Sequence, residues 1–174
     1  MRLWHSDLIP YLPNKQLISQ WRELNSIYVK EDKHILINFL YTYDEYKEQL
    51  FYYSNRVIIE MIRRTIKIKN FENYKKYFKL DNFNFFDTYE ELYQIATENT
   101  SNKYTKELFK VEMDKKYLVI CCWNLFEKYI RGQNGFRDDA VEFIINIISS
   151  PEYQFTRDEL LSYSKQLRHL NLIL

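Results

Sequence analysis

The chain is poor in glycine, cysteine and proline. Its 174 residues include two Gly, two Cys and three Pro. With only Gly132 and Gly135, a glycine-rich loop that cradles a nucleotide phosphate is excluded, and with it the chemistry that depends on such a loop. The cysteines are neighbours, Cys121 and Cys122, a spacing that suits neither a metal site nor a mutual disulfide. We interpret them as small buried apolar residues of a reduced compartment.

Long hydrophobic runs are also absent. The longest, such as Leu118 to Trp123, are far shorter than the roughly 18 residues that a membrane-spanning helix needs. Pro10 and Pro13 interrupt the first twenty residues, which lack the continuous apolar segment of a secretory signal. We therefore expect a cytoplasmic protein that does not associate with membranes.

A dominant charge of one sign is missing too, because 25 Lys and Arg face 24 Asp and Glu, a net charge of +1. This excludes a simple polycation that coats nucleic acid. Residues 1–70 nevertheless hold 11 basic against 8 acidic side chains, a local excess of +3 that is compatible with a basic surface. The three histidines, His5, His34 and His169, are too scattered for a metal site, and we expect no metal and no other cofactor.

The dominant feature is helical periodicity. After Asn14, a suitable N-cap, apolar residues recur from Leu17 to Tyr28 at the spacing of one buried helical face. Further helices are predicted over about 44–66, 88–97, 114–131, from about 141 to before Pro151, and from Thr156 onward. Residues 67–86 show no clear pattern. We predict an all-α protein with a single domain over residues 1–174.

The N-terminal region holds the best candidates for chemistry. An α-amino group has an ordinary pKa of about 7.7–8.0, well below the roughly 10.4 of lysine, so it can attack an electrophilic carbon near neutral pH. We expect Met1 to be retained, because the large Arg2 follows it, and Arg2 would lower the pKa of that amine further. Arg22 and Glu23 lie off the apolar face of their helix and are free to face a cleft. Taken alone, Met1 is more simply interpreted as an ordinary frayed terminus and Glu23 as a solvated carboxylate on a helix.

Three motifs resemble one enzyme family. They are Met1-Arg2-Leu3-Trp4-His5, the helix that ends in Trp21-Arg22-Glu23-Leu24, and the pair Lys33-His34. Together they resemble the pyrimidine-dimer DNA glycosylases of the bacteriophage endonuclease V type, and most of all a bacterial branch of that family. The resemblance covers residues 1 to about 66.

The resemblance implies a small all-α domain with the N-terminal segment lying across the helices. It implies a DNA glycosylase with AP lyase activity, in which the Met1 amine attacks C1′ of the damaged nucleotide and Glu23 handles the protons. Arg2 and Arg22 would hold the flanking phosphates. The implied partner is double-stranded DNA that carries a damaged base, and we expect a monomer.

The chain departs from the family pattern at three positions and also lacks the aromatic, basic C-terminal tail of the phage enzymes. Gln16 stands where the phage enzymes have a histidine, Ser26 stands where they have an arginine, and the amine belongs to the bulky Met1. These departures bear on specificity for dimers more than on the chemistry of the amine and Glu23.

Other residues suit DNA binding through their chemistry. Arg63 and Arg64 precede a segment in which lysines alternate with aromatic residues, Tyr74 to Lys79, a mixture that suits phosphate contacts and base stacking. A solvated helix end is the alternative. His34 suits either a phosphate contact or a structural hydrogen bond, and Lys33 beside it adds a charge. The rival hypothesis for the whole chain is a non-catalytic helical module that binds nucleic acid or protein.

Overall fold

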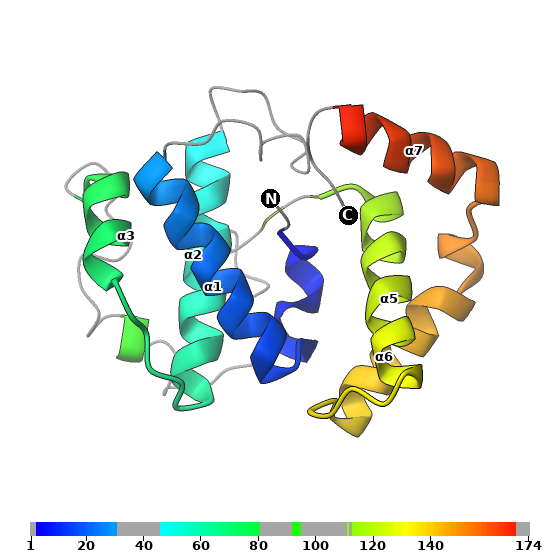
Figure 1. Cartoon of the computed structure of the whole chain (residues 1–174), viewed down its shortest axis with the longest axis horizontal. Helices are drawn as coiled ribbons and strands as arrows, with labels where there is room; N and C mark the ends of the chain where they lie inside the picture. Colours follow the sequence, from blue (N-terminus) through cyan, green and yellow to red (C-terminus); the bar gives the residue numbers. More distant parts are fainter. Residues whose placement is uncertain (1–2, 31–45, 81–91, 95–110, 112, 170–174) are drawn as a thin grey trace.

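The computed structural model describes residues 3–30, 46–80, 92–94, 111 and 113–169 (Figure 1). All regular elements within these residues are helices, which confirms the all-α prediction. Two are 3₁₀ helices and the others are α-helices: η1 (Ser6–Tyr11), α1 (Asn14–Lys30), α2 (Tyr46–Arg63), α3 (Phe71–Phe78), α5 (Lys115–Ile130), α6 (Asp138–Ser149), η6 (Pro151–Tyr153) and α7 (Arg157–His169). None of the helices in the described ranges is long and apolar enough to cross a membrane.

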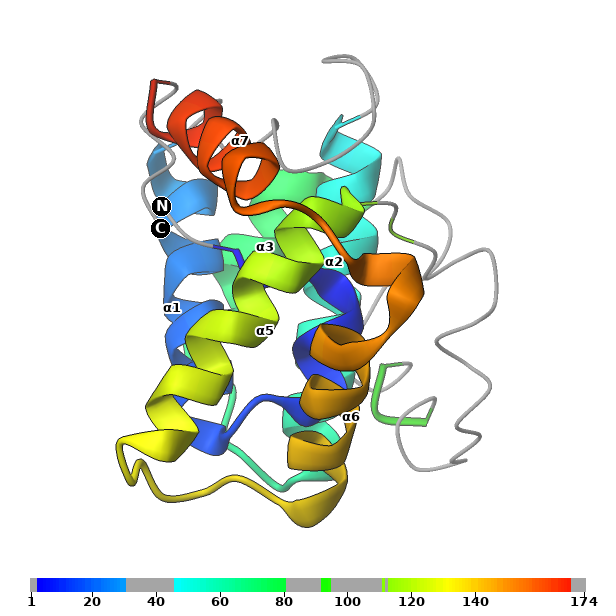
Figure 2. The same ribbon diagram turned by 90° about the vertical axis from the view of Figure 1, so that its right-hand side faces the viewer.

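The helices form two groups with the N-terminal segment between them (Figures 1 and 2). In one group α1 packs against α2 and α3, and in the other α5 packs against α6 and α7. The short helix η1 contacts α2, α5 and α6, so it joins the two groups. The segment that begins at Leu3 therefore lies across the helices, as the resemblance implied.

The apolar face predicted for the first long helix is confirmed. In α1, Leu17, Trp21 and Leu24 are buried, whereas Arg22 is exposed. In α2 the buried surface is wider than one face, because every residue from Gln49 to Ile62 is buried. The helix is therefore a central element that η1 and α1 cover from different sides.

Local capping explains where the C-terminal helices begin and end. The Asp114 carboxylate accepts a hydrogen bond from the Lys116 backbone N–H (2.7 Å), as expected for the N-cap of α5. Gly132 follows the helix with a φ of +83°, a conformation that glycine adopts without steric cost. Thr156 and Glu159 exchange the reciprocal hydrogen bonds of a capping box at the start of α7.

Three helices do not correspond to the prediction: one was not predicted, one buries a different face, and one lies mostly outside the described residues. Helix α3 lies within the unpatterned residues 67–86, where Tyr74 and Phe78, four residues apart, fill the core. The apolar spacing of the next helix predicts a buried face of Val141, Ile144, Ile145 and Ile148, but α6 buries Ala140, Ile144 and Ile147 and leaves Ile145 43% exposed, so its buried face is rotated. The helix predicted over 88–97 lies mostly outside the described residues.

Candidate active site

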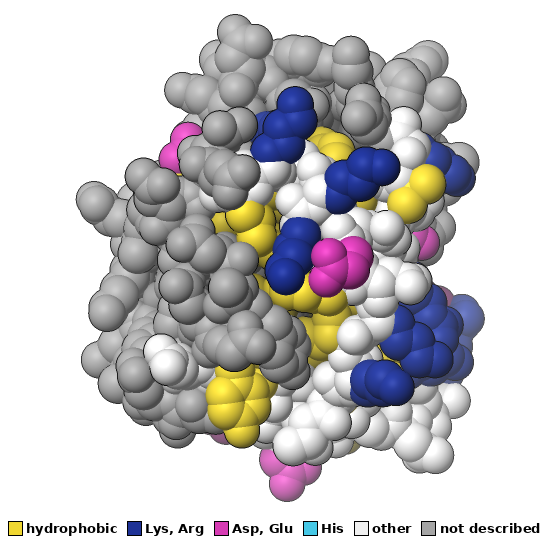
Figure 3. All heavy atoms as spheres, turned by 90° about the vertical axis from the view of Figure 1, so that its left-hand side faces the viewer, with side chains coloured by type: hydrophobic (Ala, Val, Ile, Leu, Met, Phe, Trp, Pro, Cys, Tyr) yellow, Lys and Arg dark blue, Asp and Glu magenta, His cyan; other side chains and the backbone are white. Residues whose placement is uncertain are grey.

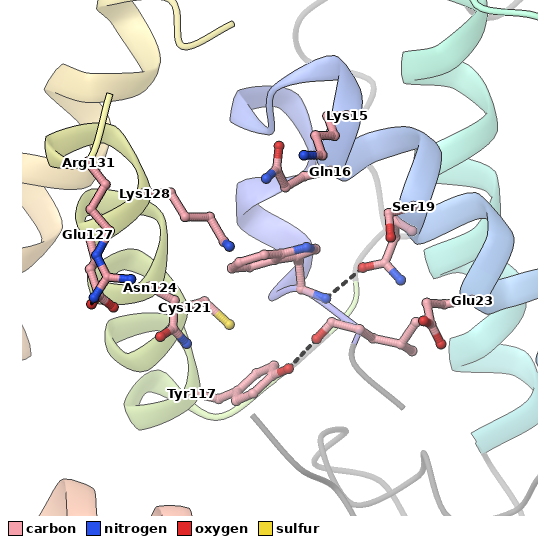
Figure 4. A pocket seen from close by; sticks show the side chains of 13 residues that line it. Lys15, Gln16, Ser19, Glu23, Tyr117, Cys121, Asn124, Glu127, Lys128 and Arg131 are labelled. Atoms are coloured by element: carbon pink, nitrogen blue, oxygen red, sulfur yellow. Dashed lines mark hydrogen bonds and ion pairs between the residues drawn. The ribbon is translucent and has the colours of Figure 1, made fainter. Parts of the chain in front are cut away.

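A pocket of about 400 Å³ lies between α1 and α5 (Figure 4). Leu3 and Trp4 of the N-terminal segment line it together with both helices. From α1 come Lys15, Gln16, Ser19, Gln20 and Glu23, and from α5 and its C-terminal end come Tyr117, Cys121, Asn124, Glu127, Lys128 and Arg131. Its volume is within the range of small-molecule sites.

Hydrogen bonds hold the backbone of Leu3 and Trp4 at the edge of this pocket. The Tyr117 hydroxyl donates to the Leu3 carbonyl oxygen, and the Tyr53 hydroxyl lies 2.6 Å from the Trp4 carbonyl oxygen. The Trp4 backbone N–H donates to Gln20 Oε1 at 2.7 Å. Helices α1, α2 and α5 thus each contribute one side chain that fixes the start of the described chain.

Glu23 presents a carboxylate to the pocket from the middle of α1. Its side chain is half-buried, and it makes no hydrogen bond or ion pair within the described part of the chain. A carboxylate in this position is available to accept a proton or to stabilise a positive charge on a bound molecule. The neighbouring Arg22 is exposed and does not line the pocket.

The opposite wall carries an amide and an amine. Asn124 and Lys128 are half-buried residues one turn apart on α5, and neither forms a hydrogen bond or ion pair with any residue that the structure describes. Lys128 extends from α5 toward α1 (Figure 4). Glu127 and Arg131, also on the pocket rim, form an ion pair with each other.

This wall was not predicted from the sequence, although the sequence contains a signal for it. The pocket residues 117, 121, 124, 128 and 131 recur at intervals of four and three, which places them on one face of a helix. This face is apolar near Tyr117 and Cys121 and turns polar at Asn124 and Lys128. The change in polarity along one face is the feature that marks where a buried helix begins to face a cavity.

The thiol and the phenol of the pocket stay protonated. Burial raises the pKa of Cys121 to about 12 and that of the Tyr117 hydroxyl well above its ordinary value of 10. Neither group is therefore a nucleophile near neutral pH. Both cysteines are free and buried, which confirms their interpretation as small core residues.

Gln16 connects the two walls. Its side-chain amide exchanges two hydrogen bonds with that of Gln133, at 3.0 and 2.9 Å, and Gln133 follows α5. The residue that departs from the family pattern thus joins α1 to the C-terminal half of the protein.

His5 lies next to the pocket segment but does not line the pocket. Burial is the main cause that lowers the pKa of its imidazole, against the opposing charge of Asp7. The Asp7 backbone N–H donates to His5 Nδ1 at 3.2 Å, which places the proton of the neutral ring on Nε2. The 3.7 Å approach of Asp7 to the same Nδ1 is therefore not an ion pair while the ring is neutral.

Arg63 and Arg64 lie away from the pocket of Glu23. The Arg64 guanidinium donates to the carbonyl oxygens of Pro10 (2.8 Å) and Leu12 (2.5 Å) and pairs with Glu60 (2.8 Å), so it fixes the connection from η1 to α1. Arg63 lies 3.9 Å from Glu60 and lines a different cavity of about 440 Å³. Contacts of these two arginines with DNA stay a prediction.

Of the remaining predicted site residues, Met1, Arg2, Lys33 and His34 lie outside the described residues. Most of the segment from Tyr74 to Lys79 lies in α3. Tyr74 and Phe78 are fully buried there and are unavailable for stacking on bases. No cluster of His, Cys, Asp and Glu that could hold a metal ion occurs within the described ranges.

An all-α protein with an accessible carboxylate and unpaired cationic and amide groups around one pocket has the groups that acid–base chemistry on a bound molecule needs. A comparison with protein families adds a match over the N-terminal part of the chain. Residues 1–73, less than half of the chain, match the family described as pyrimidine dimer DNA glycosylase. The match includes η1, α1 and α2, and ends within α3, so α5 and its pocket residues lie outside it. No curated protein and no solved structure matches the chain.

Proposed function

We propose that the protein excises damaged bases of the pyrimidine-dimer type from double-stranded DNA and cleaves the strand at the resulting abasic site. The α-amine of Met1 is the nucleophile and Glu23 handles the protons. The observation that carries this proposal is the unpaired carboxylate of Glu23 in a pocket that Leu3 and Trp4 also line. All of these residues lie in the part of the chain that matches the glycosylase family.

Chain connectivity supports the role of the amine. Consecutive Cα atoms are 3.8 Å apart, so the Cα of residue 1 lies within about 8 Å of the Cα of Leu3. Leu3 is fully buried and its carbonyl oxygen is held by Tyr117. An amine on this short tether therefore has a high effective concentration at the pocket.

The reaction proceeds in four steps. The neutral amine attacks C1′, the bond from C1′ to the base breaks, and the base takes the proton that the attacking amine loses; in a dimer this base stays joined to its neighbour through the cyclobutane ring. The C1′–O4′ bond then breaks and O4′ takes a proton from water, which opens the sugar ring and gives an iminium ion between the α-nitrogen and C1′, whose positive charge the Glu23 carboxylate stabilises. Glu23 accepts a proton from C2′, and the 3′ phosphate leaves by β-elimination. Water finally hydrolyses the imine and regenerates the amine.

Basic residues around the site are placed to contact the phosphates of the DNA backbone. Arg22 is exposed beside Glu23, and Lys15, Lys128 and Arg131 line the pocket itself. We assign phosphate contacts to Arg22 and, from the resemblance, to Arg2, Lys33 and His34. Such contacts position the duplex while the damaged nucleotide leaves the base stack.

The test is reductive trapping with borohydride, using a chain that begins with the free amine of Met1. Duplexes with a cyclobutane pyrimidine dimer or an abasic site are incubated with the protein, reduced, and separated on a denaturing gel. We expect a covalent adduct that is lost on acetylation of the amine and reduced at least 100-fold by Glu23→Gln, because general acid–base groups contribute about 10²–10⁴-fold. Glu142→Gln, an exposed carboxylate on α6, is the matched control and should trap normally. No adduct on either duplex would favour the non-catalytic binding module.

A further inference from the structure

A second cavity lies where the C-terminal end of α1, the first turn of α2 and α3 meet. Its volume is about 660 Å³. The described residues that line it are Tyr28, Val29, Lys47, Asn73, Lys76, Tyr77 and Lys79. None of them lines the pocket of Glu23, so this α3 cavity is a separate site.

Three ammonium groups and no carboxylate come from the described residues of the α3 cavity. Lys47 is half-buried, with its Nζ 4.8 Å from the centroid of the Tyr77 ring, while Lys76 and Lys79 are exposed. None of the three lysines forms a hydrogen bond or an ion pair with a residue that the structure describes. Like charges that converge without a counter-charge repel one another, and a bound anion relieves this repulsion. The α3 cavity therefore suits an anion.

The positive charge of the chain is concentrated in α3 and the segment before it. Residues 67–79 contain five lysines and one glutamate, a net charge of +4, whereas the whole chain carries +1. The other residues together therefore carry a net charge of −3. Figure 3 shows Lys and Arg side chains gathered on the face of the molecule where α3 lies. A cationic surface on an otherwise slightly acidic protein attracts a polyanion to that surface in particular.

The type of cation favours phosphates that are contacted without regard to sequence. The described residues of the α3 cavity include lysines and no arginine. An ammonium group acts on a phosphate as a point charge, whereas the planar fork of arginine makes the bidentate contacts that read carboxylates and guanine edges. A DNA backbone presents a row of phosphates to such point charges. DNA is also the polyanion that the proposed function brings to this protein.

Helix α1 separates the α3 cavity from the pocket of Glu23. The Trp21 indole N–H donates to the Lys69 carbonyl oxygen at 2.7 Å, so the segment that leads into α3 packs on the Trp21 side of α1. Glu23 follows Trp21 by two residues, or about 200° around the helix, and so points to the opposite side. Arg22 lies between these two directions and is exposed. The exposed face of α1 thus carries a cation between the two cavities.

We propose that the α3 cavity binds backbone phosphates of the substrate duplex at a distance from the damaged nucleotide. A helix with its side chains is about 10–12 Å across, which is shorter than one turn of DNA of about 34 Å, so one duplex can reach both sides of α1. The cations along this path are Lys15 and Lys128 in the pocket of Glu23, Arg22 on α1, and Lys47, Lys76 and Lys79 in the α3 cavity.

This second site adds affinity for any duplex, damaged or not, and takes no part in the chemistry at C1′. The inference rests on the proposed function only for the place of the lesion along the DNA. Its contact with phosphates can be tested on undamaged DNA, so the two proposals can fail separately.

The first experiment measures the affinity for a long undamaged duplex as a function of salt. We expect the double variant Lys76→Gln/Lys79→Gln to bind about 10-fold or more weakly at about 0.1 M salt. The slope of log affinity against log salt should fall by about 1.8, because each lost phosphate contact removes about 0.9. The matched control is Lys115→Gln/Lys165→Gln, which removes the same charge from exposed positions on α5 and α7. It should bind within about twofold of wild type with an unchanged slope.

Reductive trapping then locates the contact along the duplex. The Lys76→Gln/Lys79→Gln variant should need more abasic duplex for half-maximal trapping. At saturating duplex it should trap within about twofold of the wild-type rate, because these lysines do not touch the reacting atoms. With the abasic site placed near one end, the loss should occur only when the duplex extends across α1 toward α3.

Protection from acetylation gives a test that needs no substitution. The wild-type protein is treated with acetic anhydride, and mass spectrometry measures the modification of each lysine. An undamaged duplex should protect Lys76 and Lys79 but leave Lys165 on α7 reactive. Inorganic phosphate at the same concentration of phosphate groups should protect none of them, which distinguishes a DNA backbone from a free anion.

The outcomes separate this site from the function described above. Equal weakening of binding in both double variants, or no weakening together with no protection, would overturn the α3 cavity as a DNA site. Equal protection by inorganic phosphate would overturn the assignment to DNA, and equal losses on both end-placed duplexes would overturn the path across α1. A wild type that protects Lys76 and Lys79 with duplex but forms no adduct would overturn the proposed chemistry and leave this site in place.

Discussion

The Tyr117 hydroxyl donates a hydrogen bond to the carbonyl oxygen of Leu3, 114 residues earlier in the chain. Both residues are buried, and both line the pocket that contains Glu23. This bond joins α5 to the segment that carries the proposed nucleophile. It couples the part of the chain that matches the glycosylase family to the part that does not.

Tyr117→Phe tests this coupling. The substitution keeps the ring but leaves the Leu3 carbonyl oxygen without its donor, so we expect the free energy of unfolding to fall by about 1–3 kcal/mol. Because the segment that carries the amine is then held less firmly, trapping on the abasic duplex should slow. This should be seen even at a temperature where the variant is fully folded, so that unfolding does not explain it. Urea unfolding and single-turnover trapping measure the two effects. Tyr129→Phe, an exposed tyrosine on the same helix, is the control.

The chemical state of the pocket thiol leads to a second prediction. Since burial raises the pKa of Cys121 to about 12, the thiolate is scarce at pH 8, and burial also raises the pKa of Cys122. We expect native protein to resist alkylation by iodoacetamide at pH 8 and to react at both cysteines in urea. Mass spectrometry counts the modified thiols. Rapid alkylation of the native protein would show that the pocket opens more widely than this structure indicates.

Local features of the structure followed from the sequence because their causes are local. The helices α1 and α5 were predicted close to their observed bounds, since apolar spacing and helix caps act within a few residues. Glu23 was selected through resemblance and its position off the buried face of α1. That Glu23 and Asn124 line one cavity could not be predicted, because only the tertiary arrangement brings together positions 101 apart in sequence.

The buried histidine predicts how stability depends on pH. Burial holds the pKa of His5 below the value of about 6.5 that it has in the unfolded chain, although the carboxylates of Asp7 and Asp114 oppose this and Arg56 reinforces it. As pH falls through 6.5 the unfolded state binds a proton more readily than the folded state, so the free energy of unfolding decreases. Urea unfolding between pH 7.5 and pH 5.5 should show this decrease, and His5→Gln should flatten it. An equal slope in the variant would assign the effect to other groups.

Arg22 and Arg64 are expected to have different roles, DNA binding for Arg22 and stability for Arg64, although both were predicted to contact DNA. Arg64 donates to the carbonyl oxygens of Pro10 and Leu12 and pairs with the buried Glu60, so Arg64→Ala should lower the free energy of unfolding by about 2–5 kcal/mol. Arg22 is exposed on α1, so Arg22→Ala should leave stability within about 0.5 kcal/mol of wild type. It should instead weaken binding of every duplex and lower the salt dependence of binding by about one phosphate contact. Urea unfolding and a salt titration of DNA affinity distinguish the two roles, and a stable Arg64→Ala protein with weakened DNA binding would reverse the assignment for Arg64.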